Sequence, residues 1–475
     1  MADGSRRPLS AICHLPLAIS RRLTMRKIKA GFVGFGEVNT PREIIVRKCG
    51  EARKLLEEQG IELVATEPVS DDPQGRDVAR AKAELAREDF DLLIVCLAGW
   101  IPSYAVISVI DPFRHKPMVL WGLTGWTECG RFVTTADQAG TTALRKPMED
   151  MGYTFKYVVT YRGAAPQMER VVSFAKAARA ASLLRGARVG MMGYRDMNLY
   201  ATLHDGVSLR AKVGTEVEVF EMLEMVLAME KLDRNAVADL AERVKKRWTF
   251  VKPAKPETIE KTVRLYLALK QRIQARRYEA VSLIDVDGVK KFLKFAPAGV
   301  FMLIHEEDNI PTTPENDALG SVTQLMTRYT TGQIGAYMEF YEFMENGMLL
   351  GVPDYVPSEI VDGPVTVMPT AFGEFGEGLL NVSKVKTGKV TVARLTHTGN
   401  RYALHMATGQ AVTPRKWEEA GWTPPAPQLP SLEVILDSPV DDFVQKVLGQ
   451  HYILSYGDNT EVLKDLCRIL GVEAI

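Results

Sequence analysis

The sequence is short of several patterns that mark common classes of protein. Its five cysteines are scattered and form no C-x-x-C pair, which argues against a zinc ribbon or a disulfide framework and predicts a reducing, cytoplasmic compartment. Lys plus Arg equals Asp plus Glu, 59 of each, so no basic surplus predicts a nucleic-acid partner. No apolar run approaches the roughly 18–20 residues needed to cross a bilayer. The 475 residues therefore predict an ordinary globular protein with room for about two to four domains.

Catalytic signatures are also scarce. The motifs G-x-x-x-x-G-K-[ST], G-x-S-x-G and H-x-x-x-H are absent, which weakens P-loop, serine-hydrolase and zinc-protease interpretations. Gly34-Phe-Gly36 follows a predicted strand and leaves a nicotinamide-dependent oxidoreductase as an alternative. The third glycine of that fingerprint would fall at position 39, which is Asn, so a tight turn into a helix is favoured.

The first 24 residues stand apart in composition. Arg6, Arg7, Arg21 and Arg22 flank the apolar stretch Leu9–Ile19, as in some targeting segments. Cys13, His14 and Pro16 interrupt this stretch and Pro8 precedes it, so residues 1–24 are predicted to be a disordered extension.

Two successive α/β regions follow. Residues 25–170 and 171–345 both alternate short β-rich runs with helical patterns, which predicts doubly wound, mostly parallel sheets. Thr40, Pro41 and Glu43 predict a capping box at the first helix. The predicted strands are Ile28–Phe35, Ile61–Glu67, Asp91–Leu97, Pro117–Leu123, Thr154–Val159, Ala187–Met192, Glu216–Phe220, Glu279–Ile284 and Val300–Ile304.

The last region, residues 346–475, changes character. Strand-like runs separated by Gly, Pro and Asn predict a smaller, β-rich, antiparallel and barrel-like domain closed by a helix at Glu461–Leu470. Its predicted strands are Gly363–Pro369, Gly388–Thr396, Arg401–Ala407 and Ser431–Leu436, with a hairpin loop at Thr396–Asn400.

Two carboxylates stand out against this background. Glu315 precedes Asn316-Asp317, either of which can cap a helix from Ala318, so Glu315 would lie near unpaired N–H groups that keep a carboxylate ionised. It is equally consistent with an ordinary helix entry. Glu339 lies 24 residues later in an aromatic run, as strand or helix, with Glu342 as a rival if the run is helical. A charge in such a run is seldom buried unless paired, which favours a nearby cation.

The run His305-Glu306-Glu307-Asp308 is a further candidate for a metal site or a lid. Consecutive charges are more often a solvated loop, however.

At these residues the chain resembles the L-fucose isomerase family and its L-arabinose isomerase relatives. In that family a metal-binding Glu precedes Asn-Asp and a small-residue helix, as Glu315 does here, and a second carboxylate follows at the spacing of Glu339. The family's ligand histidine precedes a Ser-Tyr-Gly element, as His451 precedes Ser455-Tyr456-Gly457. Further similarity lies in Cys96–Trp100 and Leu120–Glu128.

The match departs from both groups at the ligands. Fucose isomerases carry Asp at the second position, whereas arabinose isomerases use two Glu and add a second His. No histidine lies between His305 and His397, so the trio Glu315, Glu339 and His451 fits the fucose type better.

The resemblance implies a metal-dependent aldose–ketose isomerase that holds Mn²⁺, Mg²⁺ or another divalent cation. Glu315 and Glu339 would move a proton between C1 and C2 of the sugar through a cis-enediolate. Arg42 and Trp100 would face the sugar in a neighbouring subunit's site, within a homo-oligomer (hexamer or trimer) whose active sites lie at subunit interfaces. A non-catalytic sugar-binding relative is the other alternative. Arg42, Arg195 and the run from His305 to Asp308 would suit a modified or anionic sugar.

Overall fold

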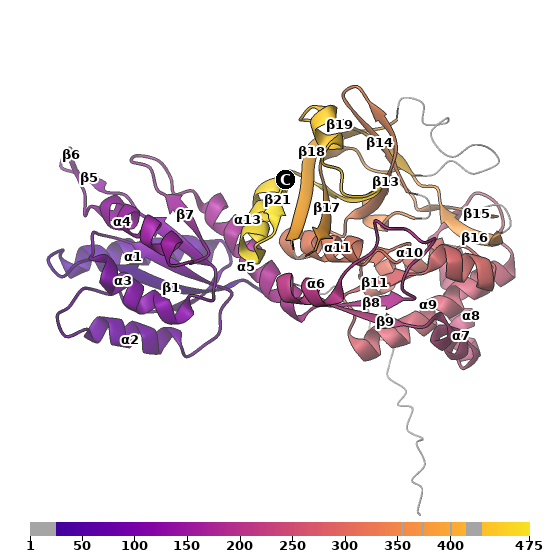
Figure 1. Ribbon diagram of the computed structural model, residues 1–475, viewed down its shortest axis with the longest axis horizontal. Helices are drawn as coiled ribbons and strands as arrows, with labels where there is room; N and C mark the ends of the chain where they lie inside the picture. Colours follow the sequence, from indigo (N-terminus) through magenta and orange to yellow (C-terminus); the bar gives the residue numbers. More distant parts are fainter. Residues whose placement is uncertain (1–24, 353–354, 372–374, 400, 415–429) are drawn as a thin grey trace, which may run out of the picture.

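The computed structural model describes residues 25–352, 355–371, 375–399, 401–414 and 430–475 (Figure 1). The predicted extension, residues 1–24, lies outside these ranges. The chain forms two parallel α/β sheets and a closed antiparallel barrel, which confirms the predicted fold class. The limits of the three predicted domains stay a prediction.

The first sheet has five parallel strands in the order β2-β1-β3-β4-β7. β3 is buried along its whole length, as expected for a strand covered by helices on both faces. The strands are β1 (Lys29–Phe35), β2 (Glu62–Ala65), β3 (Leu92–Leu97), β4 (Met118–Gly122) and β7 (Phe155–Val159). The helices are α1 (Arg42–Glu58), α2 (Arg76–Leu85), α3 (Ser103–Ile110), α4 (Asp137–Asp150) and α5 (Met168–Gly186), and a hairpin of β5 (Trp126–Glu128) and β6 (Arg131–Val133) projects from this sheet (Figure 1).

The two glycines that suggested a dinucleotide site are required for packing. A side-chain carbon on Gly34 would collide with the sulfur of Cys49, and one on Gly36 would collide with Ile45. Both partners lie on α1, so the glycines let this helix approach β1 closely. This packing accounts for Gly34-Phe-Gly36 without a nucleotide.

The predicted capping box is wrong. α1 begins at Arg42, Pro41 occupies the N-cap position, and no side chain caps the first turn. Thr40 is held in the preceding turn, where its N–H donates to the carbonyl of Glu37 at 3.2 Å. Its hydroxyl is therefore one residue too early to cap the helix.

The second sheet has four parallel strands in the order β12-β11-β8-β9. Long helices cover it, and a π-helix, η2, follows β11. The strands are β8 (Arg188–Met192), β9 (Glu216–Phe220), β11 (Ala280–Leu283) and β12 (Thr312–Thr313). The helices are α6 (Gly206–Lys212), α7 (Met222–Glu230), α8 (Arg234–Arg247), α9 (Pro256–Arg276), η2 (Asp285–Leu293), α10 (Ala298–Asp308) and α11 (Ala318–Thr331).

The predicted strand Val300–Ile304 is wrong, because these residues belong to α10. Every residue of α10 from Ala298 to His305 is buried. A helix buried on all sides has no polar face, so its apolar run has no helical period and reads like a buried strand.

The barrel closes six antiparallel strands in the order β17-β20-β13-β14-β19-β18, with β18 pairing back to β17. Because the barrel is closed, each of these six strands pairs with another strand on both sides. The barrel strands are β13 (Ala336–Met344), β14 (Gly347–Gly351), β17 (Gly388–Thr398), β18 (Arg401–Val412), β19 (Ser431–Leu436) and β20 (His451–Tyr456). The predicted hairpin between β17 and β18 is confirmed, although residue 400 of its loop lies outside the described residues.

Smaller elements tie the parts together. β10 (Thr249–Phe250) pairs with β15 (Thr366–Ala371), which pairs with β16 (Glu377–Asn381). α12 (Val440–Val444) precedes β20, and β21 (Glu473–Ala474) adds to β18. α13 (Thr460–Leu470) lies against α5 between the first sheet and the barrel (Figure 1). No helix of the described residues is long and apolar enough to cross a membrane.

Candidate functional site

The candidate site lies where the carboxyl ends of the second sheet meet the barrel. The turn after β12 carries Glu315, the start of η2 just after β11 carries Asp285, and the loop after β8 carries Asp196. Ligands of open parallel sheets usually bind at this edge.

Glu315 lies in an unusual backbone conformation. It and Asn316 both have positive φ angles, 61° and 52°, which side-chain-bearing residues rarely adopt. The N–H of Glu315 donates to Oδ1 of Asp285 at 2.7 Å, and the N–H of Asn316 donates to the carbonyl of Leu283 at 3.1 Å. Such strain persists where surrounding contacts over-determine it, and it concentrates at functional sites.

The helix after this turn is capped by Asp317, one of the two predicted caps. Oδ1 of Asp317 accepts the N–H of Gly320 at 2.8 Å. Glu315 therefore does not cap α11 but lies just before its N-terminus. That position is favourable for a carboxylate, because the positive end of the helix dipole lies beside it.

Glu339 and His451 lie directly opposite each other on neighbouring strands, β13 and β20. The strand alternative for the aromatic run is thus the correct one. Nδ1 of His451 lies 3.6 Å from Oε2 of Glu315, and Nε2 lies 4.0 Å from Oε1 of Glu339. The imidazole is 2% exposed and the Glu339 side chain 20% exposed, so the site reaches solvent on the Glu339 side.

The strand that carries Glu339 is irregular immediately beyond it. The pairing of β13 with β14 shifts between Phe340 and Glu342, which leaves Tyr341 as an extra residue. A side chain on Gly351, opposite Glu339, would collide with the Tyr341 ring. β-Bulges of this kind recur beside active sites, where they redirect a side chain.

The imidazole of His451 is held in place and is uncharged. Its ring stacks on Tyr337, with ring centroids 4.3 Å apart and planes 19° apart. Burial lowers the pKa of His451 to about 3. A neutral ring nitrogen can coordinate a cation, whereas a protonated one is blocked.

Sequence reasoning missed a buried ion pair beside the trio. Arg394 of β17 and Asp317 are each 1% exposed, and their charged groups pair through two hydrogen bonds. Burial alone would raise the pKa of Asp317, but Arg394 holds that pKa below its ordinary value. Removing one member of such a pair leaves a buried charge and destabilises a protein by roughly 3–5 kcal/mol. The only signal in the sequence is a cation within a strand.

Two further carboxylates were also missed: Asp285, which contacts Glu315, and Asp196, which lies near Asp285. Asp285 holds the Glu315 backbone and pairs with Lys290, whose Nζ lies 3.1 Å from Oδ2. Asp196 accepts the N–H groups of Val286 and Asp287 at the start of η2. Burial and the nearby Asp285 raise the pKa of Asp196 to about 7. Asp196 and Asp285 therefore make this side of the site acidic. Their negative charge is partly compensated by the N–H groups of Val286 and Asp287 and by Lys290.

The side-chain amide of Asn316 can form hydrogen bonds that no described residue supplies. Its side chain is fully buried, and neither its oxygen nor its nitrogen has a hydrogen-bond partner within the described ranges. The same holds for Nε2 of His451. Buried polar atoms are almost always bonded to protein or water, so these atoms point to a ligand or solvent partner.

The three predicted ligands have the right chemistry for a divalent cation but are not arranged as a finished site. Two carboxylates and a neutral imidazole are donors that Mn²⁺ and Mg²⁺ accept. As the side chains stand, no group of three or more His, Cys, Asp or Glu in the described part of the chain could hold a metal ion. The two ring nitrogens of His451 face different carboxylates, so the side chains would have to turn before one ion met all three. The metal trio stays a prediction.

Arg42 and Trp100 lie together in the first α/β region. Arg42 lines a cavity of about 300 Å³ formed by the turn after β1 and residues 68–70. The N–H of Glu37 in that turn donates to the carbonyl of Trp100 at 2.8 Å, and Trp100 is 39% exposed. Figure 1 shows this sheet on the opposite side of α5 and α13 from the barrel. One chain therefore presents these two residues on a different part of the molecule from the trio.

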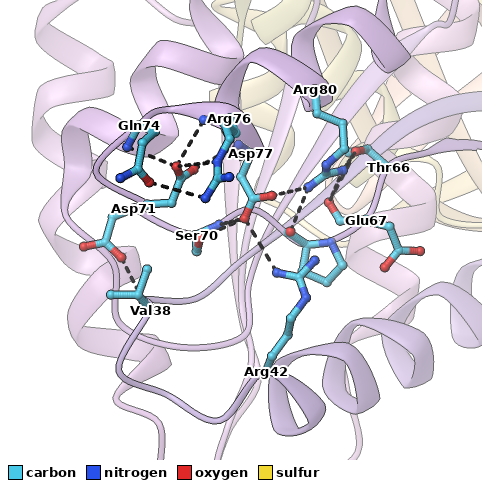
Figure 2. A network of polar contacts seen from close by, with 12 residues as sticks. Val38, Arg42, Thr66, Glu67, Ser70, Asp71, Gln74, Arg76, Asp77 and Arg80 are labelled. Carbon is cyan, nitrogen blue, oxygen red and sulfur yellow. Dashed lines mark hydrogen bonds and ion pairs between the residues drawn. The ribbon is translucent and has the colours of Figure 1, made fainter.

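Arg42 is oriented by a polar network. Its Nη1 lies 3.6 Å from Oδ2 of Asp77, as Figure 2 shows. The same carboxylate accepts the hydroxyl of Ser70 at 2.8 Å and Nη2 of Arg80 at 3.0 Å. The Arg42 side chain is 54% exposed, so it remains open to solvent.

The run His305-Glu306-Glu307-Asp308 is part of α10, and neither a solvated loop nor a metal cluster describes it. Glu306 and Glu307 pair with Arg247, and Asp308 accepts the hydroxyl of Tyr266 at 2.8 Å. These contacts attach α10 to α8 and α9. Arg195 is likewise engaged locally, with Nε donating to the carbonyl of Leu199 and the guanidinium over the Tyr200 ring.

The chain is similar to sugar isomerases. Two curated relatives, from Priestia aryabhattai and Priestia megaterium, are both named sulfoquinovose isomerase. Each is 20% identical over 383 residues, which cover 78% of this chain and 81% of the relative. This similarity supports a relationship to sugar isomerases, without selecting the L-fucose or L-arabinose group. No family model matches the chain.

Some solved sugar-transporter proteins match weakly. A solute-binding protein from Burkholderia multivorans is 11% identical with a TM-score of 0.18, over 65% of this chain and 95% of its own. One from Actinobacillus succinogenes, with bound D-allose, is 12% identical with a TM-score of 0.17, over 65% and 93%. Scores of this size carry no argument about fold or function.

The buried His305 generates a prediction about acid stability. Burial, and then the nearby Arg328, lower the pKa of His305 to about 4, and the partly exposed Glu359 lies 3.7 Å from its Nε2. The unfolded chain takes up a proton below pH 6.5 and the folded chain only near pH 4, so stability falls as pH drops through this window. Wild type should lose about 2 kcal/mol more than His305→Gln between pH 8 and pH 5.

The measurement is urea denaturation at several pH values. His115→Gln, at an exposed histidine, is the matched control and should follow wild type. Identical pH slopes for wild type and His305→Gln would contradict the prediction.

Proposed function

We propose that this protein is a metal-dependent aldose–ketose isomerase, with Glu315, Glu339 and His451 as its central residues. The observation that carries the proposal is the convergence of two carboxylates, Glu315 and Glu339, on the buried imidazole of His451, although the three residues are far apart in the chain. The similarity to two sugar isomerases supports the same reaction class.

The residues would hold a divalent cation, Mn²⁺ in preference and Mg²⁺ or another as substitutes. Nε2 of His451, which has no hydrogen-bond partner among the described residues, supports a role as a nitrogen donor. When bound, the cation supplies charge that polarises the sugar carbonyl and stabilises negative oxygen.

The chain's own residues perform the proton transfer in this proposal. One carboxylate removes the proton from C2 of the aldose, which gives a cis-enediolate. A proton passes from O2 to O1, and the carboxylic acid formed in the first step returns its proton to C1, which gives the ketose. Glu339 is the more accessible carboxylate, whereas Glu315 is fixed by its strained turn. The stacked Tyr337 and the barrel wall limit the access of water to the imidazole side.

The site is proposed to be completed by a second subunit. Arg42, at the start of α1, and Trp100, after β3, belong to the first α/β region, on the far side of α5 and α13 from the barrel. In a homo-oligomer, a trimer or a hexamer, these residues would reach the sugar in a neighbour's site. The four cysteines of the described residues form no disulfide, which is consistent with a cytoplasmic protein.

The first test is metal dependence over a panel of sugars. The panel contains sulfoquinovose, because the relatives bear that name, with L-fucose, L-arabinose, deoxy and phosphorylated sugars. We expect one sugar to be isomerised, activity to be lost with EDTA, and Mn²⁺ to restore it. No turnover of any sugar with Mn²⁺ would exclude the isomerase proposal, and full activity in EDTA would exclude the metal.

The second test replaces the carboxylates. Glu315→Gln and Glu339→Gln should lower kcat by about 10²–10⁴-fold with an unchanged circular dichroism spectrum, because the amide no longer accepts a proton. In D₂O, wild type should place deuterium at C1 or C2 of the product. Glu342→Gln, three residues along β13 at an exposed position, is the control and should retain wild-type turnover. Normal rates in Glu315→Gln or Glu339→Gln would refute the assignment, and a product without deuterium would refute the enediolate.

The third test is complementation between subunits. Arg42→Ala and Glu315→Gln are each expected to be nearly inactive alone. After co-expression the two variants mix in one oligomer. About a quarter of the shared sites would then take an intact Arg42 from the Glu315→Gln chain and an intact Glu315 from the Arg42→Ala chain, so activity should reappear. Activity no higher than the mean of the two variants would contradict a shared site.

A further inference from the structure

Arg394 connects three segments that are distant in the sequence. It lies on β17, and its guanidinium pairs with both oxygens of Asp317 at the start of α11; the bond from Nη2 to Oδ1 is 3.0 Å. Nη2 also donates to the carbonyl of Ala201, after β8, at 2.9 Å. One buried side chain thus joins the barrel to two loops at the carboxyl edge of the second sheet.

Asp317 extends this connection to all three members of the trio. It lies two residues after Glu315 and caps α11 through the N–H of Gly320. Its Oδ2 accepts the hydroxyl of Tyr337 at 2.8 Å, and the Tyr337 ring stacks on His451. Tyr337 lies two residues before Glu339 on β13, on the same face of the strand.

A second buried ion pair provides a comparison. Lys156 of β7 and Asp465 of α13 are each 5% exposed, and their charged atoms are 2.6 Å apart. That pair fastens α13 to the first sheet and contacts none of the trio. Buried ion pairs as a class add little stability over apolar packing, and in some proteins they fix one geometry instead. The geometry that Arg394 and Asp317 fix is that of the candidate site.

We propose that Arg394, Asp317 and Tyr337 form a positioning unit that sets the His451 ring and the Glu315 turn relative to each other. This inference rests on the proposed function. In this proposal the three residues have no direct contact with metal or sugar. They act through hydrogen bonds and stacking, as outer residues commonly orient metal ligands, and loss of such contacts typically lowers metal affinity by about 10–100-fold.

Two conservative variants test the unit. Arg394→Lys keeps the positive charge but loses the bidentate hydrogen bonds to Asp317, because an ammonium group is a compact point charge without the planar fork of a guanidinium. Tyr337→Phe removes only the hydroxyl and keeps the ring, so it remains informative if Arg394→Lys fails to fold. Lys156→Met breaks the comparison pair and is the control for general loss of stability.

The first readout is Mn²⁺ affinity, measured from the electron paramagnetic resonance signal of free Mn²⁺. Affinity should fall by about 10–100-fold in Arg394→Lys and in the same direction in Tyr337→Phe, and stay at the wild-type value in Lys156→Met. Folding is checked by circular dichroism. Wild-type affinity in both Arg394→Lys and Tyr337→Phe overturns the proposal.

The second readout needs neither metal nor activity. The imidazole signals of ¹⁵N-histidine protein are assigned by their loss in His451→Gln. In the metal-free protein, the His451 signals should move or broaden in Arg394→Lys and Tyr337→Phe and coincide with wild type in Lys156→Met. Coincident signals in all variants overturn the positioning unit. If wild type itself binds no Mn²⁺, the metal proposal fails, and this readout alone decides the positioning proposal.

Discussion

The ion pair between Asp317 and Arg394 is the interaction on which the candidate site depends. It buries one negative and one positive charge where the second sheet meets the barrel, and each group is stable there only because the other is present. Its carboxylate also caps α11 and holds Tyr337. The helix, the barrel strand and the stacked imidazole therefore share one electrostatic anchor.

Around this anchor the molecule combines rigid elements with one strained turn. Glu339 and His451 lie on paired strands of a closed barrel, so their separation is fixed by backbone hydrogen bonds. Glu315 lies instead on a turn with two positive φ angles, which Asp285 holds from behind. The barrel fixes the positions of Glu339 and His451, while the strained turn places the Glu315 carboxylate where a regular helix start would not.

The sequence predicted those parts that depend on local pattern. Alternating strands and helices indicated the two parallel sheets, and Asp317 was one of two predicted helix caps. The sequence-based prediction failed where the structure depends on burial or on a contact between residues far apart in the chain. The apolar run of α10 predicts a strand although it is a buried helix, and Thr40 lies in the turn before α1 instead of at its N-cap. Arg394 gave no local sign of its role, because its partner lies 77 positions away in the chain.

The order of the strands in the barrel has a consequence for synthesis. β20 is its last strand in the chain and lies between β13 and β17. As the chain leaves the ribosome, β13 and β17 emerge first with a gap between them, and that gap is filled only when His451–Tyr456 has been made. Until then both strands expose unpaired edges next to a buried cluster of carboxylates. Insertion of the final strand closes the barrel and brings the His451 imidazole to Glu315 and Glu339 in one step.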